Sequence, residues 1–310
     1  MMVTKRDLVS MRDVRDDLVG LLELAGKIKN RTKAGEPYEP LRGKSLAMIF
    51  EKASTRTRVS FEVGMTQLGG HALFLSPNDT QVGRGETIAD TARVLSRYVD
   101  GIMYRAFRRD SVRELAANAT VPVINGLDDK EHPCQIISDL FTIQERKGVL
   151  SGIKLAYVGD GNNVCNSLLL GASIVGMHMT AACPAGYEPD AELLTEARRI
   201  AKASGAKIDV KHDPVAAAKN ADILYTDVWV SMGQEKEKKE RERAFKTYQI
   251  NAKLLRAAKA GAFVMHCLPA HRGLEITDDV IDGPQSVVFD QAENRLHAQK
   301  AILARFLAGI

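Results

Sequence analysis

Residues 50–61 read FEKASTRTRVSF and follow a short apolar run, Ser45 to Phe50, which predicts a strand. The apolar residues after them recur with helical spacing, so Ser54 stands where a helix N-cap belongs. The free N–H groups of a helix's first turn and the positive end of its dipole attract an anion, and the guanidinium of Arg56 matches the oxygens of a phosphate. The stretch therefore predicts a strand–loop–helix unit that is either a phosphate site or a capped surface helix with solvated arginines.

Length and composition are typical of a globular protein with two domains. The chain has 310 residues, which is more than one ordinary core holds. Apolar residues make up 45% of it and charged residues 26%, and the formal charge of +4 is not gathered into one basic block. This distribution argues against nucleic acid as a partner, whereas a small anionic substrate needs only local positive charge.

Three further features bear on location and cofactors. No apolar run approaches the ~20 residues needed to cross a bilayer, which argues against a membrane partner. The first residues lack the apolar core of a secretory signal, so we expect a cytoplasmic protein. The four cysteines show no metal-type spacing and the histidines are scattered, so we expect no metal and no cofactor. Cys165 and Cys183 are expected to be small buried residues.

Strands and helices alternate along the chain, which predicts an α/β protein. We expect two three-layer domains, each with a mostly parallel sheet flanked by helices. Helices are expected from Asp13 to Lys33 and from Gln291 to Ala308. The charged run Gln234 to Lys246 is expected to be a mobile, solvated segment. The expected strands are Ser45–Phe50, His71–Leu75, Asp100–Tyr104, Val121–Ile124, Lys154–Val158, Met177–Ala182, Ala206–Val210, Ile223–Thr226, Ala262–Met265 and Val287–Phe289.

A glycine turn, Gly159 to Val164, invites comparison with dinucleotide-binding domains. The match is poor, because Val164 occupies the position of the third glycine. The next strand also runs into Cys183 and Pro184 without the acid that would bind a ribose. A dinucleotide-binding oxidoreductase is therefore rejected.

Four short motifs occur in one order along the chain. They are STRTR at 54–58, HPCQ at 132–135, DVWVSMG at 227–233 and HCLP at 266–269. In this order and separation they resemble the ornithine carbamoyltransferases of the aspartate/ornithine carbamoyltransferase superfamily. The resemblance implies transfer of the carbamoyl group of carbamoyl phosphate to the δ-amine of L-ornithine, which gives L-citrulline and phosphate in arginine biosynthesis.

The resemblance also implies how the chain is divided and assembled. A carbamoyl-phosphate-binding domain would span 1–147 and include a returning helix, 291–310, and an ornithine-binding domain would span 148–290. The family's assembly is a homotrimer with active sites near subunit interfaces.

The resemblance assigns one group of residues to carbamoyl phosphate. His132 would donate a hydrogen bond to the carbonyl oxygen, and Gln135 would accept one from the carbamoyl NH2 group. Gln81 matches a loop that reaches the neighbouring subunit's substrate. The implied ligands are Ser54, Thr55, Arg56, Thr57, Gln81, Arg105, His132, Gln135, Cys267, Leu268 and Arg295.

A second group is assigned to the amino acid and to the reaction. The implied ornithine ligands are Asn163, Asp227, Ser231 and Met232, and the implied catalytic residues are Arg105, His132, Asp227 and Cys267. An amine of this type titrates near 10.4, as a rough reference value, and must be neutral to attack. Asp227 and Cys267 are expected to orient the amine and to aid its deprotonation, beside a cis bond between Leu268 and Pro269.

Two alternatives stay open at this point. One is a carbamoyltransferase of the same fold that works in the catabolic direction or on another amine acceptor. The other is a non-catalytic binding protein on the same fold.

Overall fold

The computed structural model describes residues 5–76, 85–231 and 233–310. The chain divides into two compact units, Met1–Phe141 with Glu293–Ile310, and Thr142–Ala292. The divisions fall inside helices α5 (Pro133–Lys147) and α12 (Val288–Leu303), whereas the sequence placed the domain boundaries close to the ends of these helices.

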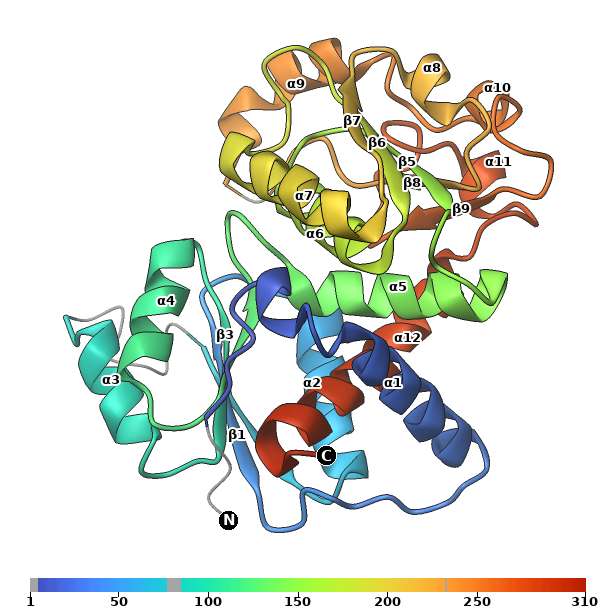
Figure 1. Ribbon diagram of the computed structural model, residues 1–310. Helices are drawn as coiled ribbons and strands as arrows, with labels where there is room; N and C mark the ends of the chain where they lie inside the picture. Colours follow the sequence, from blue (N-terminus) through green and yellow to red (C-terminus); the bar gives the residue numbers. More distant parts are fainter. Residues whose placement is uncertain (1–4, 77–84, 232) are drawn as a thin grey trace. The chain divides into compact units, whose positions relative to one another are not determined.

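The first unit contains a four-stranded parallel sheet with the order β2-β1-β3-β4. Helices α3 and α4 lie on one face of this sheet, and α1, α2 and α12 lie on the other (Figure 1). Its remaining elements are η1 (Met11–Val14), α1 (Leu18–Lys33), β1 (Ser45–Phe50), α2 (Thr55–Gln67), β2 (His71–Leu75), α3 (Ile88–Leu95), β3 (Gly101–Arg105), α4 (Arg109–Asn118), β4 (Val123–Leu127) and the π-helical turn η4 (Ala304–Ala308).

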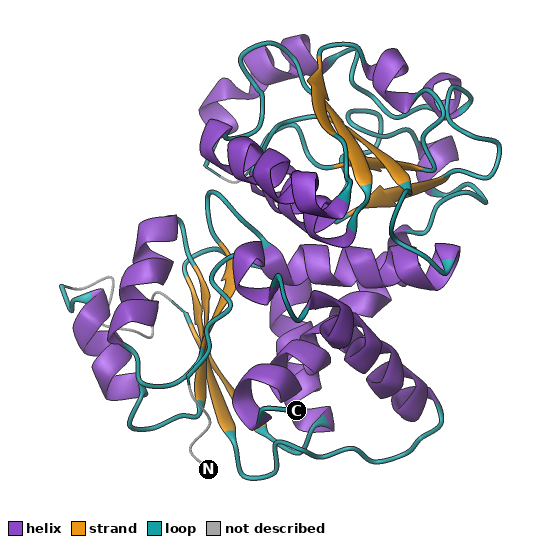
Figure 2. Cartoon of the chain, in the orientation of Figure 1, coloured by secondary structure: helices purple, strands orange, loops and turns teal. Residues whose placement is uncertain are grey.

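The second unit contains a five-stranded parallel sheet with the order β7-β6-β5-β8-β9. Figure 2 shows its strands between helices, with α6 and α7 on one face and α8, α10 and α11 on the other. Its elements are β5 (Lys154–Val158), α6 (Asn163–Val175), β6 (His178–Ala182), α7 (Ala191–Ser204), β7 (Ile208–Lys211), α8 (Pro214–Ala218), β8 (Ile223–Thr226), η3 (Glu235–Glu237), α9 (Lys238–Phe245), α10 (Ala252–Leu255), β9 (Phe263–His266) and α11 (Asp278–Ile281).

Both sheets reverse their direction of winding at one point. In the first unit the strand order reverses between β1 and β3, and in the second unit it reverses between β5 and β8. Open α/β sheets bind ligands beyond the carboxyl ends of the strands that flank such a point. The loops after β1, β3, β5 and β8 are therefore where a site is expected in each unit.

The predicted two-sheet α/β fold and the return of the last helix are confirmed. Within the first unit, Nζ of Lys29 donates to Oδ1 of Asn294 at 2.8 Å. Nζ of Lys300 donates to Oγ1 of Thr32 at 2.6 Å and to Oε1 of Gln67 at 2.8 Å. These bonds fasten α12 to α1 and α2.

Three expectations from the sequence were wrong. The strand expected at Val287–Phe289 is only the approach to α12: Val287 N–H donates to Val264 O at 3.0 Å, and helical bonding starts when Gln291 N–H donates to Val287 O at 2.8 Å. The helix expected from Asp13 begins only at Leu18, because Asp13 belongs to the separate turn η1, whose start it caps together with Ser10.

The third wrong expectation concerns the charged run from Gln234 to Lys246. It forms η3 and α9 instead of a wholly solvated segment, and Arg241 and Phe245 on α9 are buried. These two residues are four positions apart, so they share one face of the helix. Because most residues of this helix are charged, its composition does not indicate that one face is buried.

Two further observations concern cysteines and membranes. Cys165 and Cys183 are buried, as predicted, and none of the four cysteines, all of which the structure describes, forms a disulfide. Within the described ranges, no helix is long and apolar enough to cross a membrane.

Candidate active site

The loop after β1 leads directly into the start of α2, as the sequence predicted. Ser54 is the N-cap, in an extended conformation, and its Oγ accepts a hydrogen bond from Thr57 N–H at 3.3 Å. Thr55 is exposed, Arg56 is half-buried and Thr57 is buried. The N–H groups at the start of α2 and the hydroxyls of Ser54, Thr55 and Thr57 thus lie at one helix N-terminus, which favours an anion.

A chain of buried hydrogen bonds connects this turn to two other segments of the first unit. Arg295, on α12, donates through one guanidinium nitrogen to Oγ1 of Thr57 at 3.0 Å and through another to Oε1 of Gln135 at 2.5 Å. The Nε2 amide of Gln135 donates to Oδ1 of Asp139 at 2.8 Å, which fixes the direction of the amide. The oxygen of Gln135 retains a second lone pair toward which a substrate NH2 group can donate.

His132 is buried and feels the positive charges of three arginines. Burial lowers the pKa of His132 well below its usual value, and the positive charges of Arg295, Arg105 and Arg56 lower it further. The imidazole is therefore neutral at physiological pH and can offer one N–H donor. The structure brings together the predicted residues Arg56, Arg105, His132 and Arg295, in surroundings that favour a negatively charged ligand.

The sequence reading missed Lys52, which lies in the loop between β1 and α2. Burial and then the neighbouring charge of Arg105 lower the pKa of the Lys52 ammonium. Its Nζ lies 4.8 Å from the centre of the Phe107 ring. Its position in the loop after β1, close in sequence to Arg56, could have indicated that Lys52 belongs to the same cationic group.

Asp227 forms the centre of the corresponding group in the second unit. It directly follows strand β8, is only 6% exposed, and accepts three hydrogen bonds. Nδ2 of Asn162 donates to Oδ2 at 2.8 Å, and the Cys267 thiol and the N–H of Val228 donate to Oδ1 at 3.0 and 2.8 Å. Asp227 and Cys267, predicted as neighbours of one amine, are thus in direct contact.

Asn162 is a second residue that sequence reasoning missed, since it considered only Asn163. Asn162 is the N-cap of α6 and accepts from the N–H groups of Val164 and Cys165 at 3.0 and 3.1 Å. Asn163 is the first residue of α6 and is half-buried. Two adjacent asparagines after a glycine turn look alike in the sequence, and only the folded turn shows that the first caps the helix and binds Asp227.

The turn before α6 needs glycine for a packing reason. A Cβ atom on Gly161 would lie 2.3 Å from backbone atoms of Glu188 and Pro189. Gly161 N–H also donates to Tyr187 O at 2.9 Å. The turn is therefore pressed against the segment after β6, and glycine permits that close approach.

The loop after β9 is shaped by a buried histidine–glutamate pair. His266 Nδ1 accepts from Leu268 N–H at 2.9 Å, so its Nε2 carries the proton and faces Oε1 of Glu275 at 3.2 Å. Both residues are completely buried. The bond between Leu268 and Pro269 is cis, as the resemblance implied.

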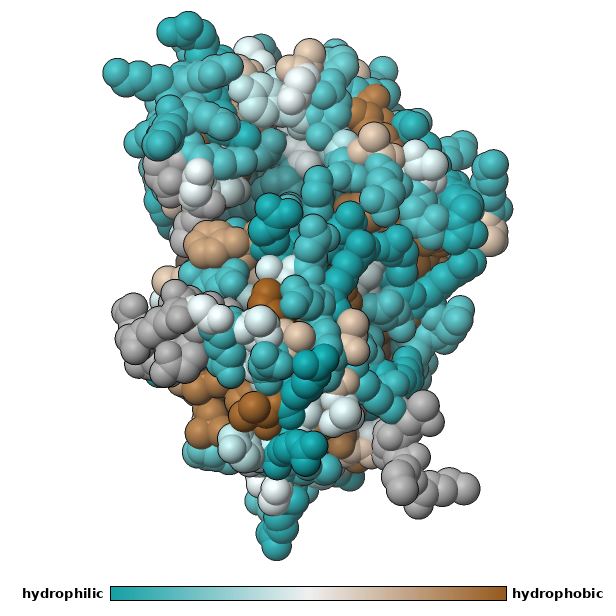
Figure 3. Space-filling model, turned by 90° about the vertical axis from the view of Figure 1, so that its left-hand side faces the viewer, coloured by the Kyte–Doolittle hydropathy of each residue, from teal (hydrophilic) through white to brown (hydrophobic). Residues whose placement is uncertain are grey.

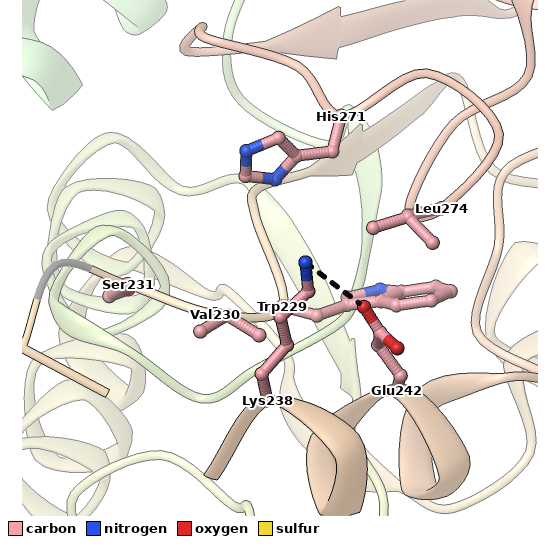
Figure 4. A pocket seen from close by; sticks show the side chains of 7 residues that line it. All are labelled: Trp229, Val230, Ser231, Lys238, Glu242, His271 and Leu274. Carbon is pink, nitrogen blue, oxygen red and sulfur yellow. Dashed lines mark ion pairs between the residues drawn. The ribbon is translucent and has the colours of Figure 1, made fainter. Parts of the chain in front are cut away.

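Ser231 lies beside a pocket of about 290 Å³ in the second unit. The backbone N–H of Ser231 donates to Oε1 of Gln234 at 3.0 Å. The pocket is lined by Trp229, Val230, Ser231, Lys238, Glu242, His271 and Leu274 (Figure 4). Two predicted ligands, Gln81 and Met232, lie outside the described residues.

Among the residues that the structure describes, one group could offer three metal ligands. Candidate ligand atoms of Asp227, His266 and Cys267 lie within 4.8 Å of one another. Both ring nitrogens of His266 already engage protein groups, however, and Asp227 is bonded to Asn162 and Cys267. These bonds suit a group that orients side chains better than one that surrounds an ion.

Each unit therefore offers a different chemistry at its point of strand reversal. The first unit presents cationic side chains, hydroxyls and helix N–H groups, which fit a phosphate and a polarised carbonyl. The second presents a buried carboxylate beside a thiol, which fits an amine.

Comparison with known proteins agrees with this division. The family model described as the carbamoyl-P binding domain of aspartate/ornithine carbamoyltransferase matches residues 6–145, and the Asp/Orn binding domain model matches residues 151–306. The ornithine carbamoyltransferase of Methanosarcina mazei is 58% identical over 304 residues, which cover 98% of this chain and 99% of that protein. The one from Oceanobacillus iheyensis is 57% identical over 304 residues, covering 98% and 94%.

A solved structure gives the same result. The structure titled ornithine carbamoyltransferase from Pyrococcus furiosus superposes with a TM-score of 0.96 at 55% identity, covering 99% of this chain and 98% of that one. The chain belongs to the aspartate/ornithine carbamoyltransferase family.

Proposed function

We propose that this chain transfers the carbamoyl group of carbamoyl phosphate to the δ-amine of L-ornithine and releases L-citrulline and phosphate. The observation that carries the proposal is the buried network in which Arg295 donates to Thr57 at the start of α2 and to Gln135 on α5. Positive charges in the same unit lower the pKa of the buried His132. Relatives with 57–58% identity over nearly the whole chain carry the name ornithine carbamoyltransferase.

The first unit would bind and polarise carbamoyl phosphate. The N–H groups and hydroxyls at residues 54–57, with Arg56 and Arg105, would hold the phosphate. Thr57, Arg105 and His132 would donate toward the carbonyl oxygen, on which negative charge develops as the amine adds. Gln135 would accept from the carbamoyl NH2 group, and Arg295, which donates to Gln135 and Thr57, would add positive charge to the site. Leu268 and Cys267 complete the proposed ligands.

The second unit would bind ornithine and present its amine. Asn163 and Ser231, with Met232, would hold the amino-acid end, and Asp227 and Cys267 would orient the δ-nitrogen. That nitrogen, in its neutral form, forms the new bond to the carbamoyl carbon. The bond from carbon to the phosphate oxygen then breaks, and phosphate leaves with the electron pair. The departing phosphate is a suitable acceptor for the proton that the amine loses.

The cellular setting is a further proposal. We infer that the reaction runs in the direction of citrulline, toward arginine biosynthesis, in the cytoplasm.

The lowered pKa of His132 supports a preformed site for the substrate dianion, because a neutral imidazole can donate while the three arginines supply the charge.

We also propose a homotrimer in which a neighbour contributes Gln81. Exposed apolar side chains in the first unit support an interface between copies: Val59 and Val63 on α2 are 50% and 37% exposed, and Leu73 on β2 is 42% exposed. Strand β2 is at the edge of its sheet. Hydrophobic areas also interrupt the largely hydrophilic face in Figure 3. Light scattering during size-exclusion chromatography tests this, and a monomer would contradict it.

The activity is tested by colorimetric detection of citrulline with purified protein. We expect formation from carbamoyl phosphate and L-ornithine, and little product when putrescine or aspartate replaces ornithine. Arg56→Gly should lose carbamoyl phosphate binding while the fold is retained. A well-folded chain that forms no citrulline, or one that prefers another amine, would contradict the proposal.

A further inference from the structure

A buried arginine that the proposed reaction does not use lies on α9. Arg241 is 7% exposed, and its NH1 atom donates to Oδ2 of Asp160 at 3.0 Å and to the carbonyl oxygen of Trp229 at 3.1 Å. Its Nε donates to Oε2 of Glu237 at 2.9 Å. The guanidinium carbon also lies 5.0 Å from the centre of the Tyr187 ring.

The two contacts at NH1 connect two separate loops. Asp160 belongs to the turn between β5 and α6, two residues before Asn162. Trp229 belongs to the loop after β8, two residues after Asp227 and two before Ser231. These loops flank the point where the strand order of the second sheet reverses, so Arg241 joins the two segments proposed to hold the amino acid.

The loop after β8 packs on one side and borders a pocket on the other. The indole of Trp229 stacks on Phe245 of α9, with ring centres 6.0 Å apart and an angle of 22° between the planes. Beyond Trp229, however, Val230 and Ser231 border the pocket of about 290 Å³ (Figure 4). Val230 also packs against the hydrophobic core, but the side of the loop that borders the pocket has open space beside it, so the bond from Arg241 to the Trp229 carbonyl adds a fixed point there.

Burial makes this ion pair costly to form. The side chains of Arg241 and Asp160 are 8% and 9% exposed, and replacing such a pair by apolar residues is often neutral or stabilising. A buried pair is therefore weak evidence for a role in stability alone. Here the geometry indicates a role in holding two loops together. The NH1 atom of Arg241 binds the side chain of Asp160 in the turn after β5 and the backbone of Trp229 in the loop after β8.

We propose that Arg241 is a positioning residue for the amino-acid substrate: it holds the loop that carries Asp227 and Ser231 at a fixed distance from the turn that carries Asn162 and Asn163. This inference rests on the proposed function. Arg241 is not among the proposed substrate ligands, so its loss is expected to affect the binding of the amino acid first.

The test compares four variants in steady-state citrulline formation. Arg241→Met alone leaves the Asp160 carboxylate buried without its partner, so the main variant is the double substitution Asp160→Asn with Arg241→Met. Arg241→Lys keeps the charge without the planar fork. Arg243→Met is the matched control, because Arg243 is exposed on the same helix.

We expect KM for ornithine to rise tenfold or more in both Arg241→Met variants and by an intermediate factor in Arg241→Lys. KM for carbamoyl phosphate should stay within twofold of the unmodified chain, and Arg243→Met should change neither constant. The double variant should melt close to the unmodified chain.

Two outcomes would overturn the inference alone. One is an unchanged KM for ornithine in the active double variant, and the other is an equal rise in KM for both substrates, which would indicate general loosening of the structure. Absence of citrulline formation by the unmodified chain would instead overturn the proposed function, and this inference with it.

Discussion

The side-chain amide of Asn162 donates to the carboxylate of Asp227 across 2.8 Å, although 65 residues separate them in the chain. The same Asn162 uses its oxygen to cap α6. One residue thus ends the turn after β5, starts the helix and orients the carboxylate at the end of β8. The direction of its amide is determined, because the oxygen faces two N–H groups and the nitrogen faces a carboxylate.

Asn162→Ser separates these two functions. Serine is also a good N-cap, so α6 should keep its start, but it lacks the amide that reaches Asp227. We expect KM for ornithine to rise by about tenfold, which corresponds to the loss of one hydrogen bond to a charged group. Citrulline formation at varied ornithine gives the value, and thermal melting should change little. An unchanged KM would show that Asp227 keeps its orientation without Asn162.

Arg295→Lys tests the buried contacts of the carbamoyl phosphate group. Lysine keeps a positive charge but cannot bind Thr57 and Gln135 through two nitrogens in one plane. We expect KM for carbamoyl phosphate to rise by roughly ten- to a hundredfold, the range for one or two charge-assisted bonds. Arg58→Lys is the control, because Arg58 is exposed on α2 and pairs with Glu62 at 3.0 Å. Equal effects of the two substitutions would contradict the assignment of Arg295.

Local signals predicted much of the fold and part of the site. The apolar run before Ser54, its hydroxyl and the following helical spacing sufficed to predict the strand, the cap and α2, because all three depend on neighbours within one turn. Proline after His132 likewise marked the start of α5, and Gly148, at φ 74°, follows its end. The expected strand ends placed Arg105 and Asp227 at the carboxyl edges of their sheets.

Contacts across long separations were not predictable in this way. Arg295 binds Gln135 and Thr57 from 160 and 238 residues away, and the sequence indicated its place only through resemblance. Arg241 was hidden because a helix with one buried arginine among many charged residues has the composition of a solvated segment. The strand orders that bring β1 beside β3 and β5 beside β8 also require the folded sheets.

The lowered pKa of His132 predicts a pH dependence of stability. In the folded chain the imidazole resists protonation, whereas in the unfolded chain it binds a proton below about 6.5. The unfolded state therefore gains protons first as the pH falls, and stability from this group is present above pH ~6.5 and is lost below it. The slope is at most about 1.4 kcal/mol per pH unit.

His132→Gln isolates this contribution, because glutamine does not titrate. Urea unfolding of the unmodified chain and of the variant between pH 7.5 and 5.5 should give two curves of stability against pH. We expect the unmodified chain to lose stability more steeply below pH ~6.5. Parallel curves would mean that His132 becomes protonated as easily in the folded chain as in the unfolded chain.

Gly161→Ala tests the close approach in the turn before α6. The added methyl group would lie 2.3 Å from backbone atoms of Glu188 and Pro189, and backbone atoms cannot move aside as the end of a flexible side chain can. We expect a loss of about 1–3 kcal/mol in stability, typical of overpacking. The turn should also shift away from Asp227, so KM for ornithine should rise together with the loss of stability.

Gly261→Ala is the matched control, because a Cβ atom there would meet nothing within 4 Å and the residue lies in another loop of the same unit. Its melting temperature and its KM for ornithine should stay close to those of the unmodified chain. Thermal melting and citrulline kinetics on the two variants separate a steric effect at residue 161 from the general effect of removing a glycine from a loop. Similar losses in both variants would contradict the steric account, and a stable Gly161→Ala variant with unchanged KM would show that the segment after β6 yields to the turn.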